Sequence, residues 1–404
     1  MMNKWTVALA ATGVVSLTSV MLAEEAKSYP VNTALSATTI SGYVDTAAIW
    51  NFGTGAKQAS RFVNTGSDRQ DGFNLNVVDI TLEKPLDEGT WSAGYKVELW
   101  AGPDSVGLPG SIGIASNLAV KQAYVALRAP VGNGIDFKVG QFDTIIGYEV
   151  ANGVANPNFS RSFGCALEPL THTGVLASYQ VTDVIGIAAG IADSATAAIN
   201  QKSTVESVKT YTAGLTLKAP ESLGFLAGSS LYAGVVDGGK LVKGGIDTVN
   251  LYVGASIATP IKALSLGVAY DYLANGSAKA SYANAFAVYA SFMATEKLKL
   301  NLRGEYANDS GGAFFGSTTA PSTSLVTTVG GVSTVTTIPG ATTINVNDEK
   351  VLSLTATADY MLWANVVTRL ELRWDRDAKG AKVGPFDNGQ RNDFSLAANV
   401  IYKF

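Results

Sequence analysis

The sequence predicts an all-β protein that crosses a membrane as an antiparallel up-and-down β-barrel of about 16 strands. Three observations carry this prediction. Apolar and polar residues alternate with period two over most of the chain, whereas helical spacing of apolar residues is almost absent. Most of the alternating segments run 10 to 14 residues, and a tilted strand needs roughly 9–11 residues to cross a bilayer. The links between the segments are short and long in turn, as in outer-membrane barrels.

The alternating segments number sixteen. Their spans are 38–50, 72–85, 90–101, 117–128, 133–142, 171–180, 184–193, 207–218, 226–237, 246–258, 263–273, 280–292, 296–307, 350–360, 364–375 and 393–404. The links after the even-numbered segments are short, such as TEK at 295–297. The links after the odd-numbered segments are mostly longer and include 51–71, 102–116, 143–170, 194–206, 308–349 and 376–392. A soluble β-sandwich does not require short links at one end of its strands and long links at the other. The alternation of link lengths therefore favours a membrane barrel.

Each segment divides into an apolar face and a polar face. In WSAGYKVELW, the odd-numbered residues from Trp91 to Leu99 are mostly apolar, while the even-numbered residues include charged ones. Lipid then covers the apolar face and water fills the lumen on the other side. Seven charged residues on the polar faces are candidate lumen-wall residues: Lys96, Glu98, Arg303, Glu305, Arg369, Glu371 and Arg373. The alternative is that these residues lie near strand ends and meet water there. Both signs of charge occur, so the sequence favours neither cations nor anions.

Tryptophans concentrate at the ends of the predicted strands. Trp50, Trp91, Trp100, Trp363 and Trp374 all fall at or near such ends. Aromatic girdles lie at this level in outer-membrane barrels, where the strands meet the lipid headgroups. We therefore expect these five side chains to mark the two interfaces.

The N-terminus predicts export. Lys4 is followed by an apolar stretch that ends at Ala23, which is typical of a signal peptide. The alternative, a membrane anchor, is disfavoured because the stretch contains several Thr and Ser residues. The predicted organisation is a signal peptide at 1–23, a short periplasmic segment at 24–37 and an outer-membrane barrel at 38–404, which places the protein in the bacterial outer membrane.

Composition excludes several classes of function. Charged residues make up 15% of the 404 residues, and the net charge of -4 argues against nucleic-acid binding. Cys165 and His172 are the single cysteine and the single histidine. They provide no disulfide, no CxxC pair, no zinc cluster and no HExxH site. A Cys165/His172 nucleophile pair is the alternative, but we expect no catalytic residues, no cofactor and no metal.

The middle of the chain resembles a known family. AYVALRAPVGNGIDFKVGQFDTIIGYEVANGVANPNFSRSF followed by HTGVLASYQVTD, together with the start TISGYVDTAAIWNF, resembles the OmpL-like β-barrel porins. The resemblance implies an outer-membrane barrel with pore activity and no catalytic residues. It also suggests that the third long loop folds into the lumen and narrows it. Asp143, Glu149, Arg161 and Glu168 are then candidate constriction residues. The alternative is a loop that packs on the barrel rim.

The C-terminus also fits this family. FSLAANVIYKF continues the alternation up to Phe404. This residue resembles the C-terminal signal read by the barrel-assembly machinery, and we expect the last strand to pair with the first. Membrane lipid is the other expected partner, and porin analogy suggests a homotrimer.

The function predicted is a water-filled channel for passive diffusion of small hydrophilic solutes or ions. One alternative is a barrel enzyme, whose only possible catalytic histidine would be His172. A second is a secreted or surface β-protein with an adhesive or structural role. The Ser/Thr-rich stretch at 308–349 fits such a surface role, although a mobile outer loop with a small hairpin at LVTTVGGVSTVTT explains it better.

Overall fold

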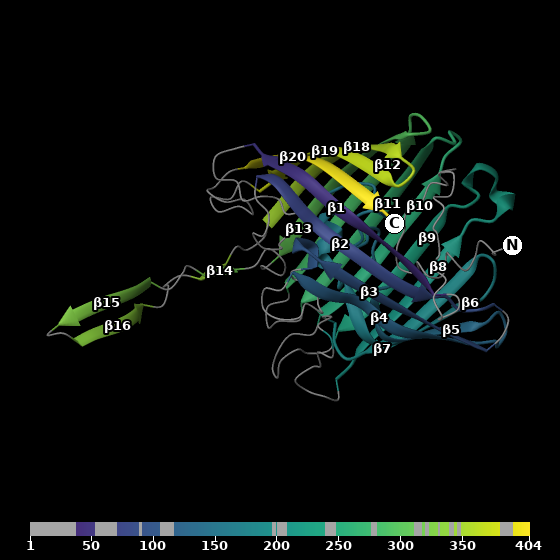
Figure 1. Ribbon diagram of the computed structural model, residues 1–404, viewed down its shortest axis with the longest axis horizontal. Coiled ribbons are helices and arrows are strands. Elements are labelled where there is room, and N and C mark those ends of the chain that lie inside the picture. Colours follow the sequence, from purple (N-terminus) through teal and green to yellow (C-terminus); the bar gives the residue numbers. More distant parts are fainter. Residues whose placement is uncertain are drawn as a thin grey trace.

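The chain forms one closed barrel (Figure 1). The computed structural model describes residues 38–52, 71–88, 91–105, 117–195, 199, 208–238, 248–275, 281–310, 317–319, 323–329, 332–338, 343–345, 349–379 and 391–404. The predicted signal peptide (1–23) and the segment 24–37 lie outside these residues. Among the described residues, no helix is both long and apolar enough to cross a membrane.

Sixteen strands make up the barrel, each antiparallel to its neighbours. They are β1 (Thr39–Asn51), β2 (Gly72–Lys84), β3 (Ser92–Ala101), β4 (Leu118–Ala129), β5 (Ile135–Asp143), β6 (Thr171–Gln180), β7 (Ile185–Ala192), β8 (Thr210–Lys218), β9 (Ser230–Gly238), β10 (Thr248–Ala258), β11 (Leu264–Asn275), β12 (Ser281–Met293), β13 (Leu298–Ser310), β18 (Glu349–Trp363), β19 (Val366–Asp377) and β20 (Asn392–Lys403). The predicted strand number and order are therefore confirmed.

Smaller elements lie in the links. They are η1 (Pro103–Ser105), α2 (Phe163–Leu167) and η2 (Glu221–Leu226), and the four short strands β14 (Ser317–Thr319), β15 (Thr323–Val329), β16 (Val332–Ile338) and β17 (Thr343–Asn345). The strands β15 and β16 pair with each other, as do β14 and β17. The small hairpin predicted in the Ser/Thr-rich stretch is thus confirmed, and Figure 1 shows it extending from one end of the barrel.

The side chains follow the predicted alternation. On β13 the leucines 300 and 302 are exposed on the outer face, whereas Arg303 and Glu305 are buried on the inner face. One tryptophan departs from the prediction. Trp100 was expected in an interfacial girdle, but it is fully buried on the inner face and its indole N–H donates to Asp79 Oδ2 at 2.8 Å. The inward position gives the indole N–H carboxylate acceptors in the lumen, and a lipid-facing position would offer none.

The barrel closes where β1 meets β20. The backbone N–H of Gly42 donates to the Phe404 carbonyl at 3.0 Å, and the Phe404 N–H returns a 3.0 Å bond to the Gly42 carbonyl. The Phe404 ring lies over Gly42, so that an added Cβ would come within 2.8 Å of the ring and would overlap the Asp79 carbonyl. The expectation that the last strand pairs with the first is confirmed, and the absence of a side chain at 42 permits the close approach.

Replacing Gly42 with valine is expected to weaken this closure. The new side chain overpacks the seam, and such overpacking costs about 1–3 kcal/mol. We expect the folded barrel to convert to its unfolded gel form at a lower temperature than wild type. Thr46→Val, at an exposed position of the same strand, is the control, and equal shifts in both variants would contradict the argument.

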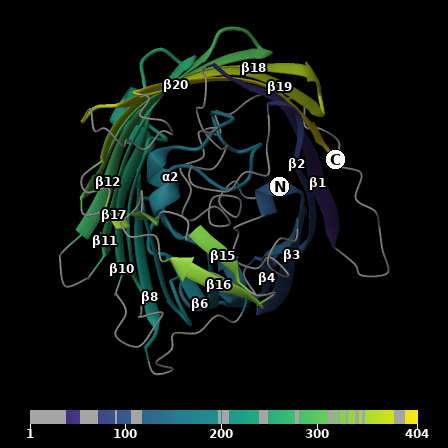
Figure 2. The same cartoon turned by 90° about the vertical axis from the view of Figure 1, so that its left-hand side faces the viewer.

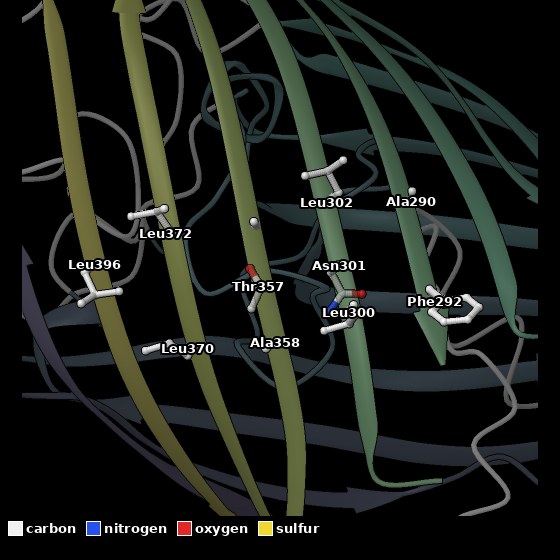
Figure 3. Close-up of a pocket in the computed structure, with 11 residues that line it drawn as sticks. Ala290, Phe292, Leu300, Asn301, Leu302, Thr357, Ala358, Leu370, Leu372 and Leu396 are labelled. Atoms are coloured by element: carbon white, nitrogen blue, oxygen red, sulfur yellow. The ribbon is translucent and has the colours of Figure 1, made fainter. Parts of the chain in front are cut away.

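The lipid-facing wall carries a shallow apolar groove of about 580 Å³ (Figure 3). Its lining comes from five neighbouring strands and includes Phe292, Leu300, Leu302, Leu370, Leu372 and Leu396. Several of these side chains belong to the exposed outer face, so the groove lies on the opposite side of the wall from the lumen.

Candidate functional site

The third long link lies inside the barrel. We call residues 144–170, between β5 and β6, the inner loop. Figure 2 looks into the barrel and shows α2, which belongs to this loop, within the ring of strands. The Thr144 N–H donates to the Leu170 carbonyl at 3.0 Å, which holds the two ends of the loop together. Most of the loop side chains are buried.

The first part of the inner loop packs on a floor of glycines. Ile145 contacts Gly214 on β8, Ile146 contacts Gly234 on β9, and Tyr148 lies over Gly267 on β11. A Cβ at any of these glycines would meet the loop side chain at 3.0 Å or less. Small inward-facing residues therefore leave room for the loop against this wall, and burial of the isoleucines stabilises it there.

The Tyr148 ring also stacks on the Tyr289 ring of β12, with 4.1 Å between ring centroids. Tyr289 in turn donates from its hydroxyl to Glu149 Oε1 at 3.2 Å. Aromatic stacking and a buried hydrogen bond thus act on neighbouring residues of the loop.

Arg303 on β13 is the centre of the loop attachment. Its Nη1 donates to Glu149 Oε1 at 2.8 Å and to the Ser160 carbonyl at 2.7 Å. Its Nε donates to Glu305 Oε2 at 2.8 Å, and Nη2 reaches Thr355 Oγ1 at 3.2 Å. The guanidinium is fully buried. Each nitrogen has an acceptor, which a buried charge requires.

β19 supplies a second attachment. Glu371 accepts from the Phe159 N–H at 2.6 Å and from the Ser160 N–H at 3.0 Å. Arg369 donates to the carbonyls of Gly153 at 2.6 Å and Asn156 at 2.9 Å. Both side chains bind main-chain groups, so they fix the path of the loop backbone and satisfy polar groups that would otherwise be buried without partners.

The end of the inner loop forms the short helix α2. Ser162 Oγ caps it by accepting from the Cys165 N–H at 3.0 Å, and Glu305 Oε1 accepts from the Phe163 N–H at 2.8 Å. Arg373 lies over the Phe163 ring, 5.1 Å from its centroid, and donates to the Arg161 carbonyl at 2.8 Å. The helix is therefore attached to β13 and β19 through charged groups.

Arg161 braces the loop internally. Its guanidinium donates to the carbonyls of Val150 at 2.8 Å, Ala151 at 2.7 Å and Phe159 at 3.0 Å. The side chain is buried. It therefore joins the outgoing and returning halves of the loop.

Two carboxyl groups meet where the loop returns past β11. Glu168 and Asp271 are hydrogen-bonded to each other. Gly147 and Gly164 lie so close that a Cβ at either would overlap one of these carboxyl groups. Burial, together with the charge of Asp271, raises the pKa of Glu168 well above its ordinary value. The pair therefore holds a proton over a pH range in which exposed carboxyl groups are ionised.

Burial also raises the pKa of the Cys165 thiol, with the charge of Glu168 as the next cause. A thiol of raised pKa is a poor nucleophile at neutral pH. His172 on β6 is buried and its Nε2 lies 3.2 Å from Thr144 Oγ1. Neither residue has the surroundings of an activated catalytic group.

The four candidate constriction residues have unequal surroundings. Glu149 and Arg161 are buried in the attachments described above, and Glu168 lies against Asp271. Asp143, at the end of β5, keeps 34% of its side chain exposed and forms an ion pair with Lys121. The structure thus joins three of the four in the loop packing and leaves Asp143 at the edge of the open lumen.

The seven candidate lumen-wall residues also separate into two groups. Arg303, Glu305, Arg369, Glu371 and Arg373 all face inward and attach the inner loop. Lys96 and Glu98 lie across the barrel on β3, where they pair at 3.2 Å. Register on this side aligns Glu83, Lys96 and Tyr124 on neighbouring strands.

Several residues of the site escaped the sequence analysis. They include Tyr289, Asp271 and the glycines 214, 234 and 267. Two asparagines also belong to this group: Asn158 donates to Thr357 Oγ1 and Asn250 donates to the Leu167 carbonyl, both at 2.7 Å. The glycines carried a usable signal, because inward-facing Gly in a strand marks a close approach of other groups. Among the described residues, no group of three or more His, Cys, Asp or Glu side chains could hold a metal ion.

The fold is similar to that of solved outer-membrane channels. The channel DcaP of Acinetobacter baumannii is 13% identical with a TM-score of 0.59, over 91% of this chain and 97% of that chain. An anion-selective porin from Comamonas acidovorans is 13% identical with a TM-score of 0.56, over 91% and 99%. Salmonella typhi OmpF in complex with daunomycin is 12% identical with a TM-score of 0.55, over 91% and 97%. At these identities the likeness concerns the fold.

A comparison with proteins of curated description found no match. The sequence model of the family described as "Putative beta-barrel porin-2, OmpL-like" matches residues 37–404. This span includes every barrel strand and the inner loop. The chain therefore belongs to the OmpL-like β-barrel porin family, and it is an outer-membrane porin.

Proposed function

We propose that this porin is a passive diffusion channel whose lumen is narrowed by the inner loop, with no chemistry of its own. The observation that carries the proposal is the attachment of residues 144–170 to inward-facing side chains of β11–β13 and β18–β19. A loop so attached occupies part of the lumen. It also packs against the opposite wall, where Ala151 lies in one cluster with Val77, Trp100 and Ala119, and solutes pass through the space that it leaves. Charge in such a narrow space is felt strongly because the surrounding wall has a low dielectric constant.

A barrel enzyme is disfavoured by the surroundings of its candidate groups. Catalysis by His172 requires a nucleophile and an orienting carboxylate nearby. Its imidazole Nε2 instead lies 3.2 Å from the Thr144 hydroxyl, and the ring lies beside Phe142. We infer that His172 packs beside Thr144, where the two ends of the inner loop meet, and has no catalytic role.

Export, assembly and association complete the proposal. Residues 1–23 act as the signal peptide, and residues 24–37 form a short segment in the periplasm. Phe404 is read by the barrel-assembly machinery, and lipid covers the outer face. We infer a homotrimer, since one solved structure of similar fold, OmpT of Vibrio cholerae, is described as a trimer form.

Planar-bilayer recording tests the channel. We expect folded, detergent-purified protein to insert as discrete, stepwise conductance increments that require no added substrate. Heat-modifiable gel mobility checks that the sample is folded. Folded protein that inserts without conductance steps would exclude the diffusion channel.

A further inference from the structure

We propose that Lys138 on β5 is a specificity-determining residue of the channel and that its ammonium group favours the passage of small anions. This inference rests on the proposed diffusion function, and the experiment below separates the two. It follows from comparing the inward-facing arginines of β13 and β19 with the inward-facing lysines of β3 to β5, and asking which of them still presents an uncompensated charge to a solute.

The arginines of β13 and β19 present no such uncompensated charge. Arg303, Arg369 and Arg373 have buried side chains and each pairs with a carboxylate at 2.8 to 2.9 Å. Their remaining N–H groups bind carbonyls of the inner loop. These cations are turned toward the loop and their charge is balanced on contact, so they attach it and do not meet solutes.

The wall between these strands and β5 contributes little charge. β6, β7 and β10 contain no Asp, Glu, Lys or Arg at all. β8 carries one charged residue, Lys218, at its last position. β9 and β11 carry one aspartate each, Asp237 and Asp271, and β12 carries no charged residue. Among the described strands from β6 to β12, Lys218 is therefore the only cation, and the next inward-facing cations along the wall lie on β3 to β5.

Three lysines face inward on β3 to β5, and two are paired. Lys121 is buried and forms an ion pair with Asp143. Lys96 lies 3.2 Å from Glu98. Lys138 has no carboxylate within ion-pair distance in the part of the chain that the structure describes, and its ammonium lies over the Tyr124 ring, 5.0 Å from the centroid. Of the three, Lys138 alone keeps its charge unmatched by a direct contact.

The contact with Tyr124 matters because it orients the ammonium without neutralising it. A neutral ring attracts a cation through its quadrupole, and the positive charge remains available to a passing ion. Tyr124 faces Gly140 across β4 and β5, and Lys138 faces Ala126, so the cross-strand neighbours of the pair are small. Both side chains are half-buried and keep part of their surface exposed. Lys138 lies in the middle of β5 (Ile135–Asp143), away from both mouths.

Reversal potentials in a KCl gradient test the inference. Lys138→Gln is expected to lower the chloride-to-potassium permeability ratio by roughly threefold, and Lys138→Glu further, since one fixed charge in a narrow pore acts strongly on mobile ions. The effect shrinks in 1 M salt because screening shortens to about 3 Å. Lys297→Gln, exposed in the turn before β13, is the matched control and keeps the wild-type ratio.

Lys138→Arg separates charge from structure. It keeps the positive charge and the stacking on Tyr124, so we expect the wild-type ratio. Wild-type ratios in Lys138→Gln and Lys138→Glu would overturn the inference, as would an equal loss in Lys138→Arg and Lys138→Gln. If wild-type protein itself shows no conductance, the diffusion function fails instead.

Discussion

Replacing Arg303 with alanine is expected to release the inner loop and raise the single-channel conductance by roughly a factor of two or more, because the loop then fills less of the lumen. The guanidinium binds Glu149, Glu305 and the main chain at Ser160. Its removal leaves two buried carboxylates without their cation. Breaking a buried pair in this way costs about 3–5 kcal/mol. We expect this cost to destabilise the loop attachment and not the barrel, because the strand backbone of β13 keeps its own hydrogen bonds.

Single-channel recording provides the measurement, with Arg376→Ala as the matched control. Arg376 is an exposed arginine on β19, and its removal is expected to leave conductance unchanged. The double variant Arg303→Met with Glu149→Gln leaves one fewer unpaired charge, so its stability should lie between wild type and Arg303→Ala. An Arg303→Ala channel of wild-type conductance would mean that other contacts suffice to hold the loop.

The barrel could be predicted from the sequence because the geometry of each strand determines which of its positions are apolar and which are polar. The alternation predicts a strand at 171–180, and β6 is Thr171–Gln180. Lipid demands apolar side chains on one face, and the lumen accepts polar ones on the other, so period two persists along each strand. Some strand boundaries differ from the prediction where a loop begins. For example, β8 starts at Thr210, whereas the predicted strand starts at 207.

The path of the inner loop could not be predicted because its contacts join residues far apart in the sequence, often through main-chain atoms. The N–H groups of Phe159 and Ser160 bind Glu371, and every residue except proline has such an N–H. Charge pattern alone marked Arg369 and Arg373 as lumen-wall residues. It did not reveal that the loop covers them.

Raising the pH is expected to loosen the returning half of the inner loop at Glu168. The pKa of this carboxyl is well above its ordinary 4.5 in the attached loop, through burial and then the charge of Asp271. Above pH 4.5 a detached, water-exposed Glu168 has lost its proton while the attached one retains it. The detached state thus binds fewer protons, and attachment weakens by up to about 1.4 kcal/mol per pH unit until the raised pKa is passed. Below pH 4.5 both states are protonated and attachment is strongest.

Hydrogen exchange of the amides in α2 measures this loosening locally. We expect protection, corrected for the intrinsic pH dependence of exchange, to fall between pH 5 and pH 8 in wild type. Glu168→Gln keeps a neutral side chain at all pH values, so its corrected protection should stay constant. Glu221→Gln, an exposed carboxyl in η2, is the control and should behave as wild type. If the loop of Glu168→Gln loosens as in wild type, the effect belongs to another group. The candidates are Asp271 and Glu149, the two carboxyl groups whose charges act on Glu168. The carboxyl pair is thus a weak point of the attachment, because Glu168 of the loop and Asp271 of the wall meet as two groups of the same charge, whereas Glu149 and Glu305 share the cation Arg303.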